Sequence, residues 1–140
     1  MSDVIRRLLD EERLEEVRPD AAAALALLEE ARRHLDSAER IGDLDPNGAY
    51  QLVYDGVRKA IAAHMAATGY RATSRPGAHV AVGEFASVSL LSTEDVARFE
   101  RVRRNRNRSE YAVAHFTRKV VADELVWARR IVGLLGERLR

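Results

Sequence analysis

Five arginines crowd one short stretch of the chain, and guanidinium groups at this density are suited to binding phosphate. The stretch carries these arginines at positions Arg101, Arg103, Arg104, Arg106 and Arg108. Like charges one helical turn apart repel one another, and only a single glutamate flanks the stretch at each end. Because a planar guanidinium forms paired, charge-assisted hydrogen bonds with phosphate, the pattern predicts a binding site for a polyanion.

Helical geometry would gather part of this stretch on one face. At about 100° per residue on a straight helix, one stripe holds Arg101, Arg104, Arg108, Tyr111 and His115. An aromatic ring beside arginines can stack on an unpaired base, which is a common way of holding single-stranded RNA. The alternative is a surface helix whose arginines pair with carboxylates of neighbouring helices, and periodicity does not separate the two.

The composition is typical of one globular domain. Its net charge is close to zero, so the excess of positive charge is local to the arginine-rich stretch. The chain has 140 residues, of which 46% are hydrophobic and 32% charged, with a formal net charge of +1. We therefore expect a single domain over 1–140, in which 1–18 form an N-terminal helical extension. An acidic run at 10–16 balances the basic segment, and the two could face each other within or between chains.

Several classes of protein are disfavoured by what the sequence lacks. There is no cysteine, so disulfides, thiolate nucleophiles and cysteine-ligated metals are excluded. No stretch approaches the roughly 20 apolar residues of a membrane span, and the first residues do not resemble a signal peptide. We therefore expect a soluble cytoplasmic protein that does not engage the membrane.

Apolar spacing and helix-breaking residues predict an all-α fold. Capping and breaking residues and apolar spacing bound the expected helices, which lie at 3–17, 19–42, 46–68, 78–90, from 93 through the basic segment, and 121–139. The segment 70–76 reads as a loop, and no β-strand is expected. The prediction is an up-and-down bundle of about four long helices plus a short helix and an N-terminal helix.

The order of these elements, with an Arg-Asn pair just before the last long helix, resembles the HEPN domain family over about 19–139. These are helical bundles of prokaryotic toxin–antitoxin and defence modules. The nuclease members carry arginine, four residues, histidine, one residue and tyrosine. On this chain Arg104 matches the arginine, Asn105 the polar residue that follows it, and Tyr111 the tyrosine, while Ser109 stands where histidine is expected.

The resemblance implies roles for these residues. Arg104 would hold the scissile phosphate, and Tyr111 would be a flanking phenol that, in modules with a nucleotidyltransferase antitoxin, can receive a nucleotide. The remaining arginines of the stretch would bind the nucleic-acid backbone. The resemblance also implies a homodimer, in which a cleft between two copies would double the positive field.

Ser109 bears directly on activity, because metal-free RNA cleavage needs a group that moves protons near neutral pH. Imidazole does so and a serine hydroxyl does not. His115 is a possible substitute if the helix bends or a second copy presents it. The sequence thus leaves open a degenerate metal-independent endoribonuclease, a silent RNA or nucleotide binder, and an antitoxin-like or accessory subunit that binds a protein such as a nucleotidyltransferase.

Other candidate groups favour structural roles. His64 lies on an apolar helical stripe and is expected to be a satisfied core histidine, whereas His34 is expected at the surface. Tyr50 and Tyr54 are one turn apart and are expected to be half-buried, and Trp127 is expected to pack. No metal-ligand spacing, phosphate-binding glycine loop or acyl-transfer motif is present, so we expect no metal and no cofactor.

Overall fold

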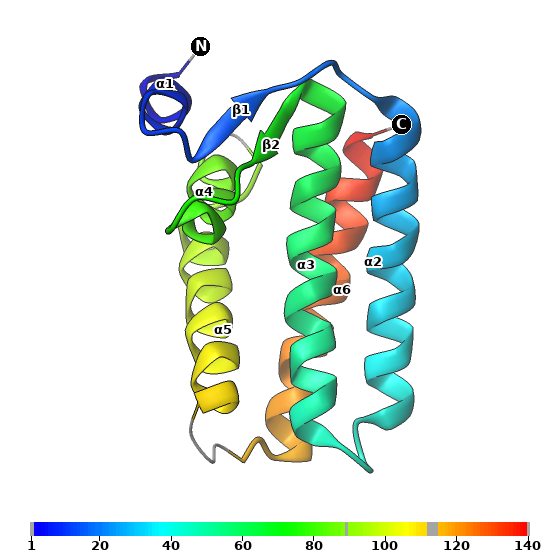
Figure 1. The fold of residues 1–140 in the computed structure, drawn as a ribbon. Coiled ribbons are helices and arrows are strands. Elements are labelled where there is room, and N and C mark those ends of the chain that lie inside the picture. The colour runs from blue at the N-terminus through cyan, green and yellow to red at the C-terminus, as the bar shows by residue number, and fades with distance from the viewer. Residues whose placement is uncertain (1, 89, 112–114, 140) are drawn as a thin grey trace.

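Four long helices that alternate in direction form the body of the protein (Figure 1). The computed structural model describes residues 2–88, 90–111 and 115–139. The long helices are α2 (Ala21–Ile41), α3 (Pro46–Thr68), α5 (Thr93–Tyr111) and α6 (Arg118–Arg138). Two short helices, α1 (Asp3–Asp10) and α4 (Ala78–Ala86), complete the helical part of the described residues. The predicted all-α helical bundle is confirmed.

Side-chain caps set the starts of the long helices, and those at Asp45 and Ser92 were predicted from the sequence. The side chain of Asp20 accepts from the N–H of Ala23 at 2.9 Å, and the side chain of Asp45 accepts from that of Gly48 at 3.0 Å. Ser92 and Thr117 cap α5 and α6 in the same way. Each cap satisfies one of the N–H groups that the first helical turn leaves without a partner.

Gly69 ends α3 in a conformation that only glycine adopts readily. Its φ is 93°, and its N–H donates to the carbonyl of Met65. A Cβ here would lie 2.9 Å from the carbonyl oxygen of Val17. Both the positive φ and the lack of space for a Cβ thus require glycine at the C-terminal end of α3.

The predictions of a helix over 3–17 and of a loop over 70–76 were each wrong for one part, since 14–16 and 70–72 are strands, while 3–10 is helical and 73–76 is a loop as predicted. Helix α1 ends at Asp10, and β1 (Leu14–Glu16) pairs antiparallel with β2 (Tyr70–Ala72). Glu12, with a φ of 57°, turns the chain between α1 and β1. Because this pairing joins segments more than fifty residues apart, local periodicity carries no signal for it. Helix α4 is also shorter than predicted and ends at Ala86.

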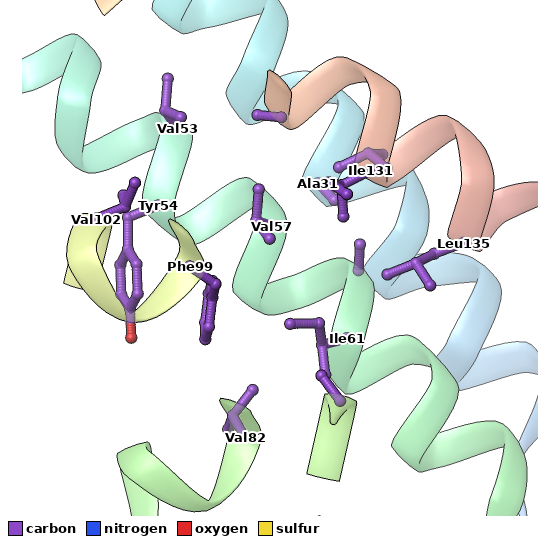
Figure 2. Packing of buried hydrophobic residues seen from close by; sticks show 14 of the residues in the cluster. Ala31, Val53, Tyr54, Val57, Ile61, Val82, Phe99, Val102, Ile131 and Leu135 are labelled. Carbon is purple, nitrogen blue, oxygen red and sulfur yellow. The ribbon is translucent and has the colours of Figure 1, made fainter. Parts of the chain in front are cut away.

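The core is organised around α3, which lies between α5 on one side and α2 with α6 on the other (Figures 1 and 2). Val53, Val57 and Ile61 of α3 are fully buried, and Phe99 of α5 and Ile131 of α6 are fully buried in the same cluster. Buried side chains of α1 and β1 join this cluster as well. Burial of these apolar side chains is the main force that holds α5 against the bundle.

None of the helices in the described part of the chain is long and apolar enough to cross a lipid bilayer.

Candidate nucleic-acid interface

One side of α5 packs against the bundle, and part of the basic segment lies on this buried side. Phe99 and Val102 are fully buried against the bundle. The guanidinium of Arg106 lies 5.5 Å from the ring centroid of Tyr54, and this distance permits a cation–π contact. The desolvation of Tyr54 raises the pKa of its phenol. Arg106 therefore lies on the core side of α5, and not on the outer stripe.

Asn105 also points inward, where it ends a chain of hydrogen bonds. Its side-chain amide donates to the hydroxyl of Tyr50 at 3.2 Å, and this hydroxyl donates to Oε2 of Glu124 at 3.4 Å. Tyr50 is fully buried, and this burial raises the pKa of its hydroxyl. Its ring stacks on that of Phe116 with centroids 3.8 Å apart. The expectation that Tyr50 and Tyr54 would be half-buried was wrong, because both are buried.

Glu124 of α6 is a buried carboxylate that forms an ion pair with Arg98 of α5. It is 5% exposed, and its Oε1 accepts from Nε of Arg98 at 2.7 Å. Arg101 approaches the same carboxylate at a longer distance, 3.8 Å. Neither Glu124 nor Arg98 was predicted from the sequence to be part of this site. The available signal was the position of Glu124, one turn from Val121 and from Ala128 on the apolar face of α6.

Trp127 connects α6 to the start of α5, which confirms its predicted packing role. Its indole N–H donates to Oδ1 of Asp95 at 3.1 Å, and the guanidinium of Arg98 lies 5.3 Å from its ring centroid. Arg130 also pairs with Asp95, at 2.7 Å. The hydrogen bond from Arg130, helped by those from Trp127 and Ser92, lowers the pKa of the Asp95 carboxyl.

The opposite side of α5 carries three exposed arginines, Arg101, Arg104 and Arg108. Their spacing of three and four residues puts them on one face of the helix. Within the described residues, Arg104 and Arg108 form no ion pair or hydrogen bond, and Arg101 has only its long contact with Glu124. Arg103 lies to one side of this stripe and is half-buried, with its Nε donating to Glu100 at 3.0 Å. We call Arg101, Arg104 and Arg108 the outer arginines.

The remaining predicted site residues lie at or beyond the end of α5. The side chains of Ser109 and Tyr111 lie outside the described residues, although both positions belong to the helix. Helix α5 ends at Tyr111, and His115 is exposed in the segment that leads to α6. The expectation of one straight helical stripe that reaches His115 was therefore wrong.

The acidic run near the N-terminus pairs with arginines outside α5. Glu11 binds Arg13 at 2.6 Å and Glu15 binds Arg71 at 2.7 Å. Glu12 pairs with Arg75. These carboxylates are therefore engaged at the β1–β2 end of the molecule and do not neutralise the outer arginines.

Histidines and acidic groups offer no metal centre in the described part of the chain, where no cluster of three or more potential ligands occurs. His64 is 7% exposed, and its Nε2 lies 2.8 Å from the carbonyl oxygen of Leu135, to which it donates. The prediction of a satisfied core histidine is confirmed. His34 is half-buried, with Nε2 2.7 Å from Nζ of Lys59, so it is less exposed than expected.

Comparison of the chain with family models, with curated proteins and with solved structures found no match. The similarity to HEPN domains stays a prediction from the order of helices and the Arg-Asn pair.

Proposed function

We propose that this protein binds single-stranded RNA through the outer arginines of α5. One observation carries the proposal: Arg104 and Arg108 are exposed and have no ion-pair partner among the described residues. At 1.5 Å rise per residue, the three outer arginines extend about 10 Å along the helix axis. A row of guanidiniums on this scale can follow the repeated charges of a phosphate backbone.

The surroundings of the outer arginines favour a polyanion over a folded protein partner. Stable protein interfaces have an apolar centre surrounded by polar groups. Among the described residues, the exposed large hydrophobic side chains belong to α2, α6 and the α2–α3 connection, and none belongs to α5. The described side chains on the outer face of α5 thus offer charge without an apolar centre.

The geometry supports binding more than catalysis. Of the residues that the HEPN resemblance assigns to chemistry, Asn105 is held by Tyr50, and serine replaces the motif histidine at position 109. A role in a toxin–antitoxin or defence module, a homodimer, a cytoplasmic location and a nucleotidyltransferase partner are further proposals that rest on the resemblance alone.

The decisive experiment measures RNA affinity as a function of salt. Fluorescence anisotropy with a labelled single-stranded RNA of mixed sequence should give a log–log salt slope of about −2, from roughly −0.7 per neutralised phosphate and three arginines. The double variant Arg104→Ala/Arg108→Ala should lower affinity and bring the slope close to −0.7.

A matched control removes the same charge elsewhere. Arg33 and Arg40 are exposed on α2, which lies on the other side of α3 from α5 (Figure 1). The variant Arg33→Ala/Arg40→Ala should keep the wild-type affinity and salt slope. Equal losses in the two double variants would mean that RNA responds only to overall charge, and the proposal would be wrong.

A further inference from the structure

A second feature, which shares no residue with the outer arginines, is a pocket where the chain crosses the end of α3. It has a volume of about 540 Å³ and lies among α2, α3, α4, β2 and the segment that leads into α2. This volume is within the range of roughly 300–1,000 Å³ that is usual for small-molecule sites. The backbone around it is fixed, because the N–H of Val17 donates to the carbonyl of Gly69 and that of Asp20 to the carbonyl of Ala66, at 2.9 and 3.0 Å.

The inner surface of the pocket is apolar. Helix α3 contributes Ala62 and Met65, α2 contributes Leu27, and α4 contributes Val82. Met65 and Val82 are almost completely buried, whereas Ala62 and Leu27 are partly open to the pocket. Such a surface favours an alkyl or aromatic body, because its burial removes apolar area from water.

The charged side chains of the pocket are mainly arginines. Arg18, Arg58 and Arg71 line the pocket together with a single carboxylate, that of Asp20, whose Oδ1 already accepts the N-cap hydrogen bond of α2. Arg71 is paired with Glu15, and Arg58 has a long, 3.6 Å contact with Asp55. Arg18 is exposed and has no ion pair among the described residues. The guanidinium of Arg18 is therefore open to a ligand, and that of Arg58 has only this long contact to exchange.

We infer that this pocket binds a small amphipathic anion, with its apolar body against α3 and its anionic head between Arg18 and Arg58. A guanidinium pairs well with both a carboxylate and a phosphate, so the head is one of these two groups. The inference does not depend on RNA binding by α5.

The test compares three ligands with the same eight-carbon chain: octanoate, octyl phosphate and octan-1-ol. Titration of the ¹⁵N-labelled protein should shift the amide signals of 62–72 and of 17–27 with at least one of the two anions. The better anion should bind about tenfold or more tightly than the alcohol, because its head gains charge-assisted hydrogen bonds. The comparison of the two anions identifies the preferred head.

Two variants separate the parts of the pocket. Arg18→Ala/Arg58→Ala should reduce binding of the anion about tenfold and leave the alcohol unaffected. Ala62→Leu, which fills the pocket with a residue that favours helix, should weaken both. Circular dichroism would confirm that each variant retains its fold.

Other outcomes would overturn the inference. Equal affinity for octanol and both anions, shifts spread over the whole surface, or unchanged anion binding by Arg18→Ala/Arg58→Ala would each contradict it. The variant Arg104→Ala/Arg108→Ala should bind octanoate and octyl phosphate like the wild type, so failure at this pocket and failure of RNA binding are told apart.

Discussion

The side-chain amide of Asn105 donates a hydrogen bond to the buried hydroxyl of Tyr50, 3.2 Å away. This contact divides the basic segment into an inner and an outer part. Asn105 and Arg106 belong to the inner part, which holds α5 against α3 and α6, while Arg104 and Arg108 stay in solvent. Neighbours in the sequence thus have different physical roles.

Replacement of Asn105 should affect stability and not RNA affinity. Asn105→Ala removes one hydrogen bond to a buried group, so the free energy of unfolding should fall by about 1 kcal/mol, as measured by urea denaturation. Arg104→Ala should instead weaken RNA binding and leave the free energy of unfolding within about 0.5 kcal/mol of the wild-type value. Loss of RNA affinity in a fully stable Asn105→Ala variant would place Asn105 in the binding surface.

Removal of the Glu124 carboxylate should destabilise the packing of α5. Glu124→Ala leaves Arg98 without its ion-pair partner, and because Arg98 is one-third exposed and can reach water, the loss should be about 2 kcal/mol, below the usual cost of breaking a fully buried pair. Glu137→Ala, at an exposed position of the same helix, is the control and should change unfolding by less than about 0.5 kcal/mol. Equal effects in urea denaturation would contradict a structural role for Glu124.

Replacement of two glycines by alanine should change the stability of the protein in opposite directions. A Cβ at Gly56 would lie 2.7 Å from Cδ2 of Leu35, where α2 and α3 approach closely. Gly56→Ala should therefore destabilise the protein by about 1–3 kcal/mol through overpacking. At Gly133 of α6 a Cβ would meet no atom within 4 Å, and Gly133→Ala should stabilise by up to about 1 kcal/mol through helix propensity. Thermal melts of both variants test this, and a stabilised Gly56→Ala would refute the close approach.

His34 should make stability sensitive to mildly acidic pH. Burial, together with the nearby Lys59 ammonium, lowers the pKa of the His34 imidazole below its ordinary 6.5, although Glu30 opposes the shift. The unfolded chain then binds the proton more readily than the folded one. The contribution of His34 is complete above pH 6.5 and is lost as the pH falls through 6.5 toward the folded-state pKa.

The measurement for His34 is the free energy of unfolding at a series of pH values from 7 to 5. His34→Asn cannot titrate, so its stability should fall less over this range than that of the wild type. Parallel curves for the two proteins would show that His34 does not contribute.

RNA cleavage by this chain should be absent. A serine hydroxyl at position 109 does not transfer protons near neutral pH as an imidazole does, so RNA incubated with the pure protein in EDTA should stay intact. Arg104→Ala is the matched control. If the wild type cleaves RNA and Arg104→Ala does not, the protein is an endoribonuclease after all. His115 would then be the next position to test.

Some helix boundaries could be predicted from the sequence because their causes are local. Asp45 and Ser92 cap the helices that follow them, and Gly69 ends α3, all as predicted, whereas the ends of α1 and α4 were predicted too late. The apolar stripe of α6 likewise predicted the burial of Val121, Leu125, Ala128, Val132 and Leu135, but not that of Glu124 and Ile131. Capping bonds and amphipathic spacing act over three or four residues, so they are visible in the chain itself.

Contacts between distant segments were decided only by the tertiary structure. The pairing of β1 with β2, the turn of Asn105 toward Tyr50 and the burial of Glu124 each join elements more than fifty residues apart. The sequence determined that an arginine-rich helix would exist, and packing decided which of its charges are neutralised. The reason is physical: the direction in which a helix presents its faces depends on how its apolar side, here Phe99 and Val102, docks on the core.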